Sequence, residues 1–265
     1  MRRLMTLLLL ALLTGTSCSE EQYTRGVAAE AAYVDLVYHL SRTDTLASRA
    51  AAATLREKVD ALRPLAHRPL RDHALDERLF HLDRASCAFL DALISVDAGT
   101  LNLAEIQLDR AVFELQAADA AVLGELYVGS IYDFAAGWMA LAATVREAAP
   151  TEFVDPDCLA YPLVAWKRMA HLRPDPLLYP ELVRDPGPFL AAHAKLNLTL
   201  AALTRKHAAG RPVTGGEVTA ASEDFWNLLV LFGTKHLRAT QDASVPASNR
   251  SATPINPAAA PGPTR

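Results

Sequence analysis

Residues 225–232 read FWNLLVLF, an apolar run that only Asn227 interrupts. Side chains three and four positions apart share one side of a helix, so a helix that is apolar almost all round has no side to present to water. We therefore expect this segment to be the most buried helix of the chain. Upstream, Thr214 and Glu217 have the spacing of a capping box, which predicts that the helix begins at the end of a turn over residues 211–216.

The rest of the chain carries the same helical signal. Apolar residues recur at steps of three and four, and no segment shows the sustained alternation with β-branched residues that is typical of strands. The composition agrees, because a chain that is 51% hydrophobic but only 7% aromatic fills its core with alanine and leucine, which suits close-packed helices. The predicted helices span residues 23–42, 45–63, 69–98, 102–123, 130–149, 162–172, 188–209 and 214–232.

These segments predict an all-α fold, an irregular antiparallel bundle of about seven or eight helices. Residues 102–149 form either one kinked helix or two helices that separate near residues 124–130. Prolines are so frequent in residues 150–188 that a long regular helix cannot form there, which predicts a Pro-rich connection with one short helix anchored by Trp166. The Pro-, Ala- and Ser-rich residues 243–265 predict a disordered tail, so the helical domain is residues 18–242.

The first eighteen residues, MRRLMTLLLLALLTGTSC, predict export. Arg2 and Arg3 precede an apolar run over residues 4–13, which is too short to span a membrane as a helix, and small residues follow at positions 14–17. We therefore expect residues 1–17 to be a signal peptide.

The small residues directly before Cys18 resemble the lipobox of bacterial lipoproteins. That resemblance, which covers the signal alone, implies cleavage before Cys18, its acylation (for example with palmitate) and anchoring to a membrane. The mature protein would then lie in the bacterial cell envelope, in the periplasm or on the outer surface. Gly15 stands where the lipobox favours leucine, so ordinary signal-peptidase cleavage after Ser17 stays an alternative.

The net charge of the chain limits the classes of partner that it can bind. The formal net charge is −4, and removal of Arg2 and Arg3 with the signal leaves 24 basic against 30 acidic residues, or −6. A mildly acidic chain has no electrostatic basis for binding nucleic acid, and it lacks the basic stripe that attracts anionic lipid. We expect no nucleic-acid partner, and we expect the lipid on Cys18 to make the contact with the membrane.

Two cysteines remain after Cys18. In an oxidising compartment Cys87 and Cys158 form either a disulfide or two separate buried thiols, and the sequence favours neither interpretation. No CxxC or CxxCH motif is present, so neither a thioredoxin-like site nor a c-type haem is expected. We predict no cofactor.

One group of residues has the spacing of metal ligands. His73, Glu77 and His81 follow one another at steps of four, which stacks two imidazoles and a carboxylate along one side of a helix. That side lies opposite the apolar stripe of the same helix and is surrounded by charged residues. A solvated helix surface is therefore the favoured interpretation, and a metal site is the alternative.

The sequence predicts binding rather than catalysis, because it contains no GxSxG, HExxH or phosphate-loop motif. We expect a non-enzymatic helical protein of the envelope that binds or assembles with an envelope protein partner. The alternative is a periplasmic protein that binds a small molecule or a metal. An exposed apolar patch would favour the partner, whereas a cavity lined by Trp166 or Trp226 with a few convergent polar groups would favour the ligand.

Overall fold

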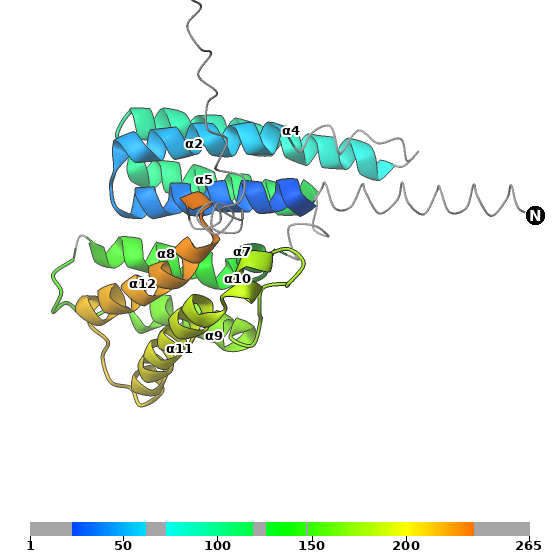
Figure 1. The fold of residues 1–265 in the computed structure, drawn as a ribbon. Helices are drawn as coiled ribbons and strands as arrows, with labels where there is room; N and C mark the ends of the chain where they lie inside the picture. The colour runs from blue at the N-terminus through cyan, green and yellow to red at the C-terminus, as the bar shows by residue number, and fades with distance from the viewer. Residues whose placement is uncertain (1–22, 62–72, 119–125, 147, 236–265) are drawn as a thin grey trace, which may run out of the picture.

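A computed structural model describes residues 23–61, 73–118, 126–146 and 148–235 (Figure 1). The predicted signal peptide, Cys18 and the predicted tail at residues 243–265 lie outside the described residues. In the helix that begins at His73, the side chains of residues 73–79 also lie outside them.

The described part of the chain is all-α, as the sequence predicts, and it contains no strand beyond an isolated bridge between Phe153 and Thr214. In chain order the helices are residues 23–41, α2 (Thr45–Asp60), α4 (His73–Asp97), α5 (Leu101–Ala118), α7 (Tyr127–Ser130), α8 (Tyr132–Arg146), α9 (Pro156–Met169), α10 (Pro180–Arg184), α11 (Gly187–Ala208), α12 (Gly215–Leu229) and the 3-10 turn η1 (Val230–Phe232).

The helices form two layers (Figure 1). Helix 23–41, α2, α4 and α5 lie side by side in the first layer, where α4 packs against both α2 and α5. The second layer consists of α7 to α12 and η1, with α8 packed against α9 and α12. A single hydrophobic cluster includes residues of both layers, so the two share one core.

Short-range signals set the helix ends where the sequence predicts them. The carboxylate of Asp44 accepts a hydrogen bond from the Ala47 amide at 3.0 Å and caps α2. Gly99 ends α4 with a φ of 73°, a left-handed conformation that glycine adopts without strain. Thr214 and Glu217 form both halves of the predicted capping box at the start of α12.

The run at residues 225–232 is buried as predicted. Phe225, Leu228, Leu229 and Phe232 have no exposed surface, and Asn227 is the exposed residue of the run. Aromatic packing continues outward from it, because the Phe232 ring stacks on Tyr127 with 4.6 Å between centroids. Helix α12 packs against both α8 and α11 in the second layer.

Helix 23–41 is almost as deeply buried, and here the sequence-based expectation of one apolar stripe is too narrow. Thr24 is its only exposed residue, and Ala29, Ala31 and Ala32 are all within the core. The helix touches neighbours on nearly every side because small alanine side chains let other helices approach closely. The pattern of large apolar residues predicts burial of one side of the helix only, so it does not predict that the sides with alanine are buried as well.

The region between α5 and α8 contains separate helices rather than one kinked helix. Residues 119–125 are outside the described part, and α7 and α8 follow, separated by Ile131. Ser130, the predicted first residue of the later helix, does not begin that helix. Its hydroxyl instead donates to the Tyr127 carbonyl at 2.6 Å and closes α7.

The Pro-rich connection holds a longer helix than the sequence predicts. Helix α9 begins at Pro156 rather than at Pro162, with Asp155 as its cap through the Asp157 amide. Proline fits the first turn because its missing N–H has no partner there in any case. Pro162 lies inside the helix and is buried, close to Gly137 of α8. Burial against α8 offsets the hydrogen bond that an interior proline removes.

Candidate functional site

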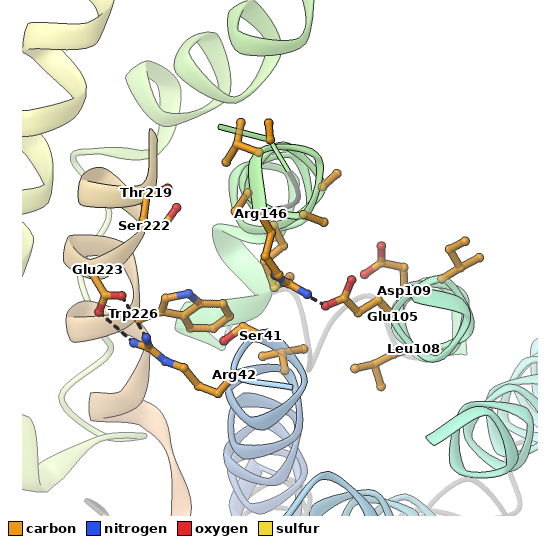
Figure 2. A pocket seen from close by; sticks show the side chains of 18 of the residues that line it. Ser41, Arg42, Glu105, Leu108, Asp109, Arg146, Thr219, Ser222, Glu223 and Trp226 are labelled. Carbon is orange, nitrogen blue, oxygen red and sulfur yellow. Dashed lines mark hydrogen bonds and ion pairs between the residues drawn. The ribbon is translucent and has the colours of Figure 1, made fainter. Parts of the chain in front are cut away.

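A pocket of about 540 Å³ lies where the two layers meet, between helix 23–41, α5, α8 and α12 (Figure 2). Pockets of this size hold small organic molecules. Its walls are mostly apolar, and the larger contributors are Val37, Leu108, Met139, Val145, Pro150 and Trp226.

Trp226 forms the wall on the α12 side. Only 6% of the residue is exposed, and its ring packs edge-on against Tyr38 with 5.9 Å between centroids. Because Tyr38 packs against the Trp226 ring, the ring surface that lines the pocket is held in one position. Trp138 and Trp166, in contrast, are committed to the core, where their indole N–H groups donate to Ser222 and Asn197.

Two ion pairs border the pocket (Figure 2). Arg42 binds both carboxylate oxygens of Glu223 at 2.9 and 2.8 Å, and this contact holds the pKa of Glu223 below its ordinary value. Arg146 of α8 lies 3.5 Å from the carboxylate of Glu105 on α5. Each pair joins residues from different helices, so both pairs help to position the pocket walls.

Asp109 follows Glu105 by one turn of α5, and Figure 2 shows both carboxylates projecting from the same side of the helix. The Asp109 carboxylate makes no hydrogen bond or ion pair with another described residue. Burial, with the neighbouring Glu105 charge, raises the pKa of Asp109 to about 6. Burial also raises the pKa of Glu105, although Arg146 opposes that shift. The pocket therefore holds a carboxylate whose charge no described residue neutralises through a direct contact.

A second polar cluster surrounds Glu30, at the middle of helix 23–41. Its Oε1 atom accepts from the amides of Val128 and Gly129 at 2.7 and 3.3 Å, and its Oε2 atom accepts from the Tyr179 hydroxyl. The residue is buried, and this burial raises the pKa of Glu30 to about 7 despite those hydrogen bonds. Through these hydrogen bonds, the cluster connects helix 23–41 with α7 and with the segment before α10.

A small cavity of about 50 Å³ lies beside Glu30 and is also lined by Tyr33. The buried Tyr33 hydroxyl has no hydrogen-bond partner among the described residues. The cavity is large enough for one or two water molecules, and a water there would satisfy that hydroxyl. We assign this cluster a structural role, because its polar groups are directed at one another.

The structure describes one of the three predicted metal ligands. The Nδ1 atom of His81 lies 2.7 Å from the carboxylate of Glu114 on α5, which also receives Arg84 at 2.6 Å. Burial opposes ionisation of Glu114, but these two contacts outweigh it and lower the pKa of Glu114. The side chains of His73 and Glu77 lie outside the described residues. Among the described residues, no three His, Cys, Asp or Glu side chains are grouped as a metal ion requires.

Cys87 and Cys158 are both free and exposed, so the structure contains neither the predicted disulfide nor the alternative pair of buried thiols. Cys87 lies on α4 in the first layer and Cys158 on α9 in the second (Figure 1). The two layers hold these helices apart.

Sequence reasoning missed the pocket residues, apart from Trp226, which it named as a candidate pocket wall. Glu105, Asp109 and Arg146 look like ordinary surface charges of helices. Glu30 carried a signal, since it lies three residues after Val27 and four before Val34, on the apolar side of its helix. A charged residue in such a position predicts a buried polar contact.

No family model matches the sequence, and no curated protein or solved structure is significantly similar to it. The site therefore has to be interpreted from its own geometry. Among the helices of the described residues, none combines the length and the apolar character that crossing a membrane requires.

Proposed function

We propose that this protein is an exported, non-enzymatic binding protein of the bacterial cell envelope, and that the pocket between its layers holds a small molecule. The observation that carries the proposal is the pocket itself, which combines a volume of about 540 Å³, a rigid Trp226 wall and convergent polar groups. The signal-like residues 1–17 and the lipobox-like approach to Cys18 support export and anchoring.

The polar groups of the pocket suit binding better than catalysis. The hydroxyls of Ser41, Thr219 and Ser222 donate to backbone carbonyls of their own helices at 2.7 to 2.9 Å. A catalytic hydroxyl needs a neighbouring base to remove its proton, and no histidine is among the described lining residues. The charged groups of the described lining are two arginine–glutamate pairs and the carboxylate of Asp109, which can orient a ligand.

The proposal is tested by blocking the pocket. Ala143 lines it, and Ala143→Leu adds three carbon atoms to the lining. Ala194→Leu on the exposed side of α11 makes the same change away from the pocket and serves as the matched control. Small-molecule binding to the mature chain is followed by thermal shift and by tryptophan fluorescence. We expect Ala143→Leu to weaken binding and Ala194→Leu to leave it unchanged; equal binding by both variants contradicts the proposal.

An exposed apolar surface supports a second candidate function, the binding of an envelope protein partner. On α5, Leu103, Ile106 and Phe113 are 46%, 63% and 63% exposed. Large apolar side chains exposed along one helix are typical of contact surfaces. Phe113→Ser with crosslinking of intact cells tests this function, since a partner that uses α5 is lost from the crosslinked products. Unchanged products contradict it.

The anchor on Cys18 is tested separately by mass spectrometry of the mature N-terminus. We expect a chain that begins at Cys18 and carries fatty acyl groups. An unmodified Cys18 removes the membrane from the proposal but leaves ligand binding intact.

A further inference from the structure

The charges that line the pocket do not balance. Among the described residues, its ionisable groups are two arginines, Arg42 and Arg146, and three carboxylates, Glu105, Asp109 and Glu223. Each arginine is paired with one glutamate, so the described lining carries one excess negative charge, on Asp109.

The arrangement also disfavours an anion. Arg42 uses two N–H groups on Glu223, and its guanidinium lies over the Tyr38 ring at 5.4 Å. Arg146 is held at Glu105. Both arginines already have a carboxylate partner, so an anionic ligand at either of them would compete with that carboxylate.

Trp226 and Asp109 project from opposing sides of the pocket, from α12 and α5 (Figure 2). The indole ring offers an apolar and electron-rich surface, which attracts both hydrocarbon and organic cations. The carboxylate offers a partner for a positive charge. Figure 2 shows the Arg146–Glu105 pair between them, and the apolar residues of the lining include Met139 and Val145.

We propose that the ligand of this pocket is a singly charged amphipathic cation, a primary amine or quaternary ammonium on an apolar body, whose charge is bound by Asp109 and whose body packs on Trp226. This inference rests on the proposed small-molecule function and specifies its ligand class. A cation beside Asp109 also lowers the cost of holding a carboxylate in a partly buried position, because it replaces the water that burial removes.

The test uses three probes that share one body and differ in charge: phenylbutylamine, phenylbutanol and phenylbutyrate. Binding is measured by calorimetry on the full mature chain with Cys18→Ser, so that no detergent is needed. We expect the amine to bind about tenfold or more tightly than the alcohol, as for a charge-assisted contact, and the carboxylate to bind most weakly. Asp109→Asn should abolish the preference for the amine and leave the affinity for the alcohol within about twofold.

Asp157→Asn, on the exposed first turn of α9, removes a charge away from the pocket and should retain the amine preference. An alcohol or carboxylate that binds as tightly as the amine overturns the inference but not the proposed function. An amine preference that survives Asp109→Asn also overturns it. The absence of binding by all three probes overturns the inference. If Ala143→Leu also leaves the binding of every other small molecule unchanged, the proposed function fails as well. The wild-type comparison decides the inference even if Asp109→Asn does not fold.

Discussion

The buried carboxyl of Glu30 makes the stability of this protein depend on pH in a direction opposite to that of an ordinary salt-bridged glutamate. The native state holds the proton of Glu30 up to a pKa of about 7, whereas the ordinary value is 4.5. Burial is the main cause, and the hydrogen bonds from Tyr179, Val128 and Gly129 reduce the shift without cancelling it.

The sign follows from the number of protons that each state binds. Between the two pKa values the native state keeps the proton and the unfolded state loses it, so the free energy of unfolding falls as the pH rises. The contribution is fully present below about pH 4.5 and is lost as the pH passes about 7. A difference of between two and three pKa units corresponds to about 3 kcal/mol.

Glu30→Gln removes this titration and keeps the shape of the neutral side chain. Each protein is unfolded in urea at two pH values, one near 4.5 and the other one unit above the raised pKa of about 7. The two proteins at the two pH values give the four free energies of unfolding that the comparison needs. We expect wild type to lose about 3 kcal/mol more than Glu30→Gln over that range. Other groups that titrate, Asp109 among them, are present in both proteins and cancel in the comparison.

Glu152→Gln is the matched control, because Glu152 is exposed and its replacement should leave the pH profile of wild type unchanged. Parallel profiles for wild type and Glu30→Gln would refute the reasoning, since they would mean that Glu30 titrates alike in both states. Glu30→Ala addresses the hydrogen bonds instead. It leaves the Val128 amide and the Tyr179 hydroxyl without their partner, and should cost about 3 kcal/mol or more at every pH.

Three further substitutions test the packing and the helix ends. Phe225→Ala empties a fully buried site and should lower the free energy of unfolding by about 3–5 kcal/mol in urea; a loss below about 1 kcal/mol would show that the site collapses or is not buried. Thr214→Ala removes half of the capping box with Glu217 and should cost about 1 kcal/mol, seen as a lower melting temperature, while an unchanged temperature would argue against the cap. Gly99→Ala forces a side chain into a left-handed conformation with open space around it, so we expect a loss of about 1 kcal/mol by chemical denaturation, and a gain in stability would contradict the backbone geometry.

Much of the fold follows from short-range chemistry. Asp44 and the pair Thr214 and Glu217 cap helices because each side chain reaches an amide three residues away, and that geometry needs no information from the rest of the chain. For residues 102–149 the sequence leaves one kinked helix or two helices open, and it predicts that the later helix begins at Ser130, which instead ends α7. A serine can end one helix as readily as it begins the next, and packing selects between the two.

The start of α9 was missed for a related reason. A proline is compatible with the first turn of a helix and costly in its interior, so the sequence predicts a helix that begins at Pro162. Its burial close to Gly137 of α8 outweighs the lost hydrogen bond, and this neighbour lies 25 residues earlier in the chain. Such a contact is invisible to any argument from periodicity.

The periodicity of apolar residues was sufficient for the all-α class and for the deep burial of residues 225–232, because both depend on residues a few positions apart. The pocket depends on long-range contacts. Arg42 meets Glu223 across 181 residues. The separate Glu30 cluster depends on such contacts as well, because Glu30 reaches Tyr179 across 149 residues. Side chains that look like solvated charges in the sequence line a common pocket only when the two layers bring them together, and the position of one layer on the other is set by packing over the whole core.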